Sequence, residues 1–228
     1  MPKFISYQEA ASMIPDGATV MFGGFMGCGA AHNVLAELAR LGTKDLTMIT
    51  DDTAFPNGPN GSDFYGHAVL IHNRQVKKFI GTHVGLLPDM QQQMRENSIE
   101  TCLLPMGSFV EMVRAGGAGL GAIVTPTGVG TLVEENEFVH SKTEIDGRTY
   151  LVMKPLKADF ALISGYNIDK AGNIWYKGTT RNFSHYMAMA ADVVIAEAEN
   201  VVEIGTIEPE NVMTPGILID YVASGKEA

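Results

Sequence analysis

Cysteine and positive charge are both scarce in this sequence. The only two cysteines, Cys28 and Cys102, give neither a disulfide framework nor a cysteine-rich metal site, and they fit a reducing compartment. Lysine and arginine number 16 against 26 aspartates and glutamates, so the formal net charge is −10 at pH 7. Nucleic acids and anionic membranes bind basic patches. The charge balance therefore argues against both as partners, although backbone dipoles still allow a small anionic ligand.

Long apolar runs, a signal peptide, repeats and linkers are also missing. No apolar stretch is long enough to cross a bilayer, and Met1–Ala11 lacks the basic start and apolar core of a signal peptide. His67, His72 and His83 do not have the spacing of metal ligands, so we expect no metal site. With 46% hydrophobic residues, the chain can bury a substantial core. We expect a soluble, cytoplasmic protein with a single domain over residues 1–228.

What is present, first, is a regular alternation of predicted helices and strands. Ser6 and Glu9 form a plausible capping box for the first helix, and Ser108 is the predicted cap of a later one. Alternating helices and strands predict right-handed crossovers and a mainly parallel sheet, which is an α/β fold. The predicted helices are Ser6–Met13, Ala30–Gly42, His67–His72, Pro88–Asn97 and Ser108–Arg114, and the predicted strands are Thr19–Phe22, Leu46–Ile49, Val76–Gly81 and Ile99–Leu104.

The amino-acid composition changes after Arg114. Residues Gly116–Gly121 and Thr125–Thr131 are too rich in glycine for a helix or a central strand. Glu144–Tyr150 is typical of a β-hairpin with an Asp-Gly turn. The core then resumes with strands predicted at Phe160–Ile163 and Val193–Ala196, a helix beginning at Tyr186–Ala191 and a closing apolar segment at Ile217–Val222.

The stretch Gly23–Gly29 connects a predicted strand to a predicted helix and organises the chain. Its sequence is Gly-Gly-Phe-Met-Gly-Cys-Gly. Glycines at such a turn permit positive φ and the close approach of a ligand to the backbone. The N–H groups at the start of the following helix favour an anion, typically phosphate. In α/β sheets the ligand usually lies at this position.

Two other interpretations of the turn remain open at this point. A dinucleotide-binding fold requires Gly-x-Gly-x-x-Gly or Ala at the last place, and the pattern that starts at Gly27 fails at His32. A dehydrogenase is therefore disfavoured. The glycines can also serve only the packing of helix against strand, and the motif by itself does not separate this role from ligand binding.

Taken together, the glycine stretches resemble those of class I coenzyme A-transferases. The match begins with Asp16-Gly17, Val20-Met21-Phe22 and Gly23–Gly29, and it continues in order through almost the whole chain. It is similar in particular to the α (A) subunit of the acetate/butyrate–acetoacetate and succinyl–3-oxoacid types. The later stretches that agree are Asp52-Thr53, Arg114–Gly121, Thr125–Thr131, Arg181-Asn182-Phe183 and Met213–Gly216.

The resemblance implies an open three-layer α/β/α fold and a heteromeric enzyme, with an α₂β₂ assembly expected. In this chemistry a glutamate attacks acyl-CoA, forms glutamyl-CoA through an anhydride and passes CoA to a second carboxylic acid such as acetoacetate, acetate or butyrate. That glutamate belongs to the β subunit. Glu199-Asn200-Val201 lacks the glycine of its motif, and Glu134 with Glu135 is better explained as a solvated pair. We therefore predict no catalytic nucleophile in this chain, and no cofactor besides CoA as substrate.

The same resemblance implies the residues that bind CoA or substrate. Met106 departs from the family, which has glutamine there in Pro-Gln-Gly; the glutamine amide holds the acyl carbonyl, whereas a thioether donates no hydrogen bond. Ala31 replaces a proline of the signature, and the loop Asp51–Gly66 is longer than in the family. A non-catalytic domain that senses a phosphosugar or a nucleotide is the alternative function. The predicted binding residues are Gly23, Gly24, Phe25, Met26, Gly27, Cys28, Gly29, Met106, Gly117 and Gly119.

Overall fold

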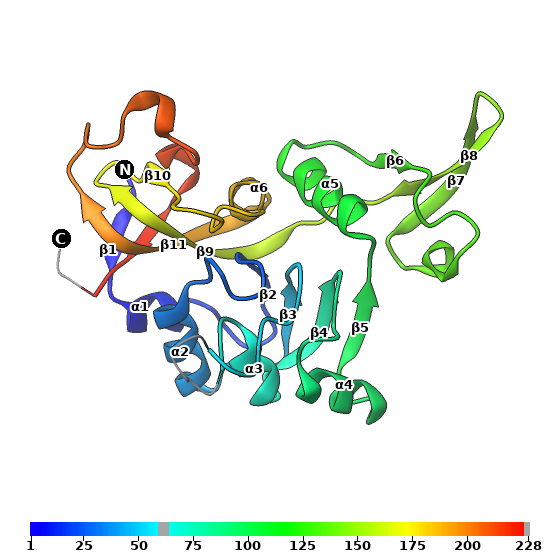
Figure 1. Cartoon of the computed structure of the whole chain (residues 1–228), viewed down its shortest axis with the longest axis horizontal. Coiled ribbons are helices and arrows are strands. Elements are labelled where there is room, and N and C mark those ends of the chain that lie inside the picture. The colour runs from blue at the N-terminus through cyan, green and yellow to red at the C-terminus, as the bar shows by residue number, and fades with distance from the viewer. Residues whose placement is uncertain (59–63, 226–228) are drawn as a thin grey trace.

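A computed structural model describes residues 1–58 and 64–225. Within them a large sheet has the strand order β1-β12-β11-β9-β2-β3-β4-β5, and each neighbouring pair is parallel (Figure 1). The short β10 pairs antiparallel with the end of β9. The strands are β1 Lys3–Ile5, β2 Thr19–Phe22, β3 Leu46–Ile49, β4 Val76–Gly81, β5 Glu100–Leu103, β9 Ala158–Asp169, β10 Ile174–Trp175, β11 Ala191–Val202 and β12 Tyr221–Ala223.

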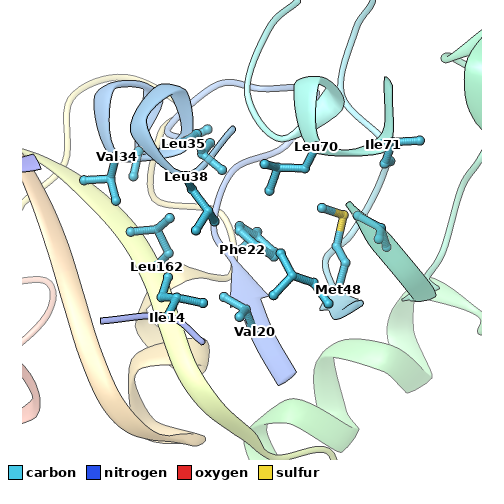
Figure 2. Packing of buried hydrophobic residues seen from close by; sticks show 14 of the residues in the cluster. Ile14, Val20, Phe22, Val34, Leu35, Leu38, Met48, Leu70, Ile71 and Leu162 are labelled. Atoms are coloured by element: carbon cyan, nitrogen blue, oxygen red, sulfur yellow. The ribbon is translucent and has the colours of Figure 1, made fainter. Parts of the chain in front are cut away.

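Helices cover both faces of this sheet. The first four lie on one face and α5 and α6 on the other (Figure 1). Figure 2 shows Phe22 of β2 surrounded by Leu38 and Leu70 from the helices of the first face. Met21, its neighbour in the strand, packs into the core on the second face, as period-two alternation requires. The helices are α1 Tyr7–Ser12, α2 His32–Leu41, α3 Ala68–His72, α4 Pro88–Arg95, α5 Met106–Gly117 and α6 Ser184–Met189.

The α/β class, the mainly parallel sheet and the three layers are therefore confirmed. So is the capping box of α1, in which Glu9 N donates to Ser6 Oγ and Ser6 N donates to Glu9 Oε2 at 2.8 Å. The strands β9 and β11 are each 12 residues long and extend well beyond the predicted runs. Their second halves carry polar residues that interrupt the apolar pattern, but the two strands pair with one another along almost their whole length.

Two predictions about α5 are wrong. The helix begins at Met106, so Ser108 is a buried residue inside it rather than its cap. The helix also continues through Gly116 and Gly117. A Cβ atom on Gly116 would overlap the carbonyl oxygen of Leu156, and one on Gly117 would lie 2.5 Å from Cβ of Met189. Glycine costs about 1 kcal/mol in a helix, and here close packing of the helix end outweighs that cost.

A second, antiparallel sheet extends from the α/β body on the side of β5 (Figure 1). It consists of β6 Ile123–Thr125, β7 Val139–Ile145 and β8 Arg148–Met153, with β8 in the middle. Asp146 and Gly147 form the predicted hairpin turn, at φ 51° and 74°. Lys78 Nζ in β4 pairs with Glu137 at 2.6 Å and ties this arm to the body. The single-domain organisation of residues 1–228 stays a prediction.

Candidate functional site

Residues 23–29 form a tight hairpin at the carboxyl end of β2. Phe25 and Cys28 exchange two backbone hydrogen bonds, with N···O distances of 3.0 and 2.9 Å. The two residues between them, Met26 and Gly27, are both left-handed, at φ 53° and 81°. This is the backbone pattern of a two-residue type I′ turn. The turn projects beyond the strand as a small closed loop.

Three glycines of this turn are required by the protein's own packing. A Cβ atom on Gly27 would overlap the ring of Tyr65, and one on Gly29 would overlap the carbonyl oxygen of Thr180. On Gly23 it would lie 2.6 Å from Ser184 Oγ. Contacts within the protein therefore require glycine at these three positions, although those of Gly27 and Gly29 are to loop residues and not between helix and strand. Their role in binding CoA or substrate stays a prediction.

The anion expected at the start of α2 is supplied by the protein itself. Glu197, a buried residue of β11, accepts hydrogen bonds from Asn33 N at 3.2 Å, from Asn33 Nδ2 at 2.8 Å and from Val34 N at 2.9 Å. Burial raises the pKa of Glu197, and these donors oppose that shift. The N–H groups of the first turn of α2 thus face a carboxylate, so we do not place a phosphate there.

Two side chains distant in sequence clamp the turn. Asp52, which is 1% exposed, accepts from Met26 N at 2.7 Å and from Ala54 N at 2.6 Å. Asn182 accepts from Gly24 N at 3.1 Å and donates to the Cys28 carbonyl oxygen at 3.1 Å. Both residues lie in stretches that carry the family resemblance, but the sequence did not reveal their roles because the partners are 26 and 158 residues apart.

A pocket of about 450 Å³ opens beside the turn. One wall is the turn, and the other comes from the loop after β3, where Tyr65 N donates to the Phe55 carbonyl oxygen at 3.0 Å. The ring of Tyr65 also stacks on His32, with centroids 4.5 Å apart. Residues 59–63 of the long Asp51–Gly66 loop lie outside the described residues. The pocket is lined by Phe25, Met26, Cys28, Phe55, Asn57, Tyr65 and Thr179.

The structure brings only some of the predicted site residues together at this pocket. Phe25, Met26 and Cys28 line it, whereas Met106, Gly117 and Gly119 do not. Met106 follows β5 and is 44% exposed at the first position of α5. The strands β5 and β2 are three places apart in the sheet, at about 4.8 Å per place, so Met106 is on the order of 14 Å from the turn. Gly119, at φ 70°, has open space around it.

Polar residues are buried between the turn and Met106, after β3 and β4. Asp51 accepts from Thr82 Oγ1 through its Oδ1 at 2.8 Å, while its Oδ2 has no hydrogen-bond partner among residues 1–58 and 64–225. Burial raises the pKa of the Asp51 carboxyl. His67 Nε2 lies 2.6 Å from the Asp52 carbonyl oxygen, and burial lowers the pKa of this imidazole. These groups connect the loop after β3 to the sheet.

Four further observations concern groups outside the pocket and the described residues as a whole. Glu134 accepts from Gly130 N at 2.7 Å and pairs with Lys142, so it fastens the loop of the arm. Across residues 1–58 and 64–225, no group of three or more His, Cys, Asp or Glu side chains is arranged to hold a metal ion. Within the same ranges no helix is long and apolar enough to span a membrane. Tyr176 is a core residue, and its hydroxyl lies 2.9 Å from Thr214 Oγ1.

Comparisons with known proteins give one consistent result. The profile of the family described as Coenzyme A transferase matches residues 4–225. The chain is 46% identical over 220 residues to the alpha subunit of the acetoacetyl-CoA:acetate/butyrate CoA transferase of Clostridium acetobutylicum, and the alignment covers 96% of each chain. It is 39% identical over 226 residues to the alpha subunit of the acetate CoA-transferase of Escherichia coli K12, and that alignment covers 99% of this chain and 98% of the relative.

Solved structures share the fold at lower sequence identity. An acyl-CoA transferase from Escherichia coli O157:H7, crystallised as a thioester complex with CoA, superposes with a TM-score of 0.85 at 24% identity. The match covers 98% of this chain and 49% of that one. Glutaconate coenzyme A-transferase from Acidaminococcus fermentans gives a TM-score of 0.82 at 16% identity, covering 97% of this chain and 75% of that one.

Proposed function

Because the chain belongs to the coenzyme A transferase family, we propose that it is the alpha subunit of a heteromeric enzyme that moves CoA between a short-chain acyl-CoA and a carboxylic acid. The observation that carries this proposal is the match to an alpha subunit named for acetoacetyl-CoA, acetate and butyrate, because the alignment covers 96% of this chain and 96% of that subunit. The corresponding subunit of a 3-oxoadipate CoA-transferase from Acinetobacter baylyi is 40% identical. The acids therefore differ among relatives, and acetate, butyrate and acetoacetate are the candidates here.

The partner in this proposal is a beta subunit, in an α₂β₂ assembly. Relatives named as alpha or A subunits support a two-subunit enzyme. Transfer through glutamyl-CoA requires a carboxylate nucleophile. Among the described side chains that line the pocket none is a glutamate, and Glu134 is engaged by Lys142. We therefore assign the nucleophilic glutamate to the beta subunit, with CoA as substrate and no further cofactor. A cytoplasmic location is part of the proposal and rests on the two free cysteines.

This chain would supply one wall of the active site. The turn at residues 23–29 and Met106 both follow parallel strands, at the sheet edge where α/β proteins bind ligands. Asp52 and Asn182 fix the turn before any substrate arrives. Such preorganisation matters because catalysis depends on holding reacting groups in place. A domain that only senses a phosphosugar or nucleotide is not favoured, since the relatives are transferase subunits and Glu197 occupies the start of α2.

The test is to express this chain alone and together with its beta partner, and to assay CoA transfer from acetyl-, butyryl- and acetoacetyl-CoA to acetate or butyrate. We expect no activity from the chain alone and activity from the co-purified pair. A beta subunit whose nucleophilic glutamate is changed to glutamine is the control, because it should assemble normally and transfer nothing. Transfer by this chain in isolation would contradict the division of roles.

A further inference from the structure

Two side chains of the large sheet hold the exit segment, residues 29–34, in which the turn ends and α2 begins. Ser164 of β9 and Glu197 of β11 are paired in register, and each is 6% exposed. We propose that Ser164 and Glu197 are positioning residues for CoA transfer, because together they fix the exit segment, and with it the turn, against the sheet. The inference rests on the proposed function, in which the turn is part of the active-site wall, and adds two residues that act through that wall.

The two side chains hold opposite ends of the exit segment. Ser164 Oγ donates to the carbonyl oxygen of Gly29 at 2.8 Å. Glu197 accepts from Asn33 N, Asn33 Nδ2 and Val34 N, at 3.2, 2.8 and 2.9 Å. The strands β9 and β11 run side by side, and residues that are paired in register project from the same face of a sheet (Figure 1). Both contacts therefore reach the exit segment from one level of the sheet.

The helix α2 lacks a cap from its own sequence. Its N-cap residue is Ala31, which forms no capping hydrogen bond with its side chain. A serine, threonine, asparagine or aspartate there would accept from the same N–H groups that Glu197 now pairs with. A local cap of that kind stabilises a helix without fixing its position, whereas a cap that comes from β11 also ties the start of the helix to the sheet.

This arrangement has a cost that a positioning role explains. Burial raises the pKa of Glu197, so its carboxylate is kept out of water at an energetic penalty. The entry to the turn is fixed separately, by the hydrogen bonds that Asn182 and Asp52 accept from Gly24 N and Met26 N. With the exit released, the turn would keep these bonds but would be free to shift at its other end. A displacement of about 1 Å in an active site can lower the rate about a hundredfold.

The first experiment compares Glu197→Gln with the matched control Asp169→Asn in the assembled alpha–beta enzyme. Asp169 is also a buried carboxylate that accepts from two backbone N–H groups and one asparagine side chain, but it closes the hairpin after β9, about 16 Å beyond Ser164. In each variant the new amide leaves one donor unpaired, so Tm should fall by similar amounts. We expect kcat for CoA transfer from acetyl-CoA to fall about tenfold or more only in Glu197→Gln, with KM little changed.

Two results of this experiment are decisive in different ways. Equal kcat values in Glu197→Gln and Asp169→Asn would overturn the inference, because loss of stability would then explain the whole effect. A wild-type pair that transfers CoA from none of the acyl-CoAs tested would instead refute the proposed function.

The second experiment separates positioning from capping by adding Ala31→Ser to Glu197→Gln. The serine hydroxyl can accept from Asn33 N or Val34 N, so part of the lost Tm should return. We expect kcat to stay low, because the new cap is not attached to the sheet. Recovery of kcat together with Tm would overturn the inference, since Glu197 would then serve only the stability of α2.

The third experiment, Ser164→Ala, does not depend on whether Glu197→Gln assembles. It removes the hydrogen bond to the Gly29 carbonyl oxygen. The control is Ser12→Ala, which removes a hydrogen bond from a serine hydroxyl to a backbone carbonyl oxygen in α1. We expect kcat to fall severalfold in Ser164→Ala and to stay at the wild-type value in Ser12→Ala. A wild-type kcat in Ser164→Ala would contradict the assignment of the pair.

Discussion

The adjacent acids Asp51 and Asp52 are both buried, but replacing each with asparagine should have opposite consequences. The two oxygens of Asp52 accept one backbone N–H each, from Met26 at 2.7 Å and Ala54 at 2.6 Å. Asparagine keeps only one acceptor, and its NH₂ group would face the other N–H. A hydrogen bond to a charged group contributes about 1.5–3 kcal/mol, and a buried donor left unpaired costs about 1–3 kcal/mol. We expect Asp52→Asn to destabilise the fold by about 3 kcal/mol.

The neighbouring substitution Asp51→Asn is the matched control. Within the part of the chain that the structure describes, only one carboxylate oxygen of Asp51 has a partner, the hydroxyl of Thr82, and an amide oxygen can accept that bond equally well. The change also removes a buried carboxyl whose pKa is raised by burial. We therefore expect Asp51→Asn to alter the free energy of unfolding at pH 7 by no more than about 1 kcal/mol, which is a usual value for a substitution that creates no new structural defect.

Thermal unfolding of the purified chain distinguishes the two cases. For a protein of this size 1 kcal/mol corresponds to about 2–4 °C, so Tm should fall by about 6–12 °C for Asp52→Asn. The raised pKa of Asp51 means that the folded wild type binds more protons than the unfolded chain, so stability from this group is present at low pH and is lost as pH rises through the folded pKa. The Tm of Asp51→Asn relative to wild type should therefore increase with pH in the acidic range. Equal losses for both variants would refute the reasoning.

The other predictions concern the turn and the edge of the sheet. Gly27→Ala should reduce kcat/KM of the assembled enzyme at least tenfold, because the new Cβ overlaps the ring of Tyr65. The control is Gly42→Ala, which is also at positive φ but has open space around it. It should cost only about 1 kcal/mol of stability and leave kcat/KM unchanged. If Met106 faces the acyl carbonyl, Met106→Gln should raise turnover on acetyl-CoA by up to about a hundredfold, the usual effect of one oxyanion donor, and lower it on longer acyl chains. Equal kinetics for Gly27→Ala and Gly42→Ala, or an unchanged chain-length profile for Met106→Gln, would contradict these assignments.

The parts of the fold that follow local rules could be predicted from the sequence. The spacing of apolar residues predicts the alternating strands and helices from β2 to β5. The capping box of α1 and the Asp146-Gly147 turn are also predictable, because they depend on residues close together in the sequence. The extension of α5 through Gly116 and Gly117 was not predictable, because it depends on where Leu156 and Met189 pack. Long-range contacts overrode the local preference of glycine there.

The candidate site was likewise predictable only where its residues are close together in the sequence. The turn itself was identified, since its glycines are clustered in sequence. Its clamps and the second wall of the pocket were not, because Asn182 and Phe55 act on residues that only the folded sheet brings near. Glu197 is the clearest case: a carboxylate 164 residues from Asn33 occupies the helix start that was expected to hold a ligand anion. No local sequence pattern predicts such a partner.

The position of β12 between β1 and β11 has a consequence for how the chain is made. β1 comprises Lys3–Ile5, and its hydrogen-bonding neighbour is β12 at Tyr221–Ala223, far along the chain. β12 must therefore be synthesised before this edge of the sheet can form, and the parallel pairing then closes a very long loop. Until then β1 has no strand to pair with and α1 follows an unanchored segment. β1, which precedes the other described strands in the chain, is thus among the last of them to pair.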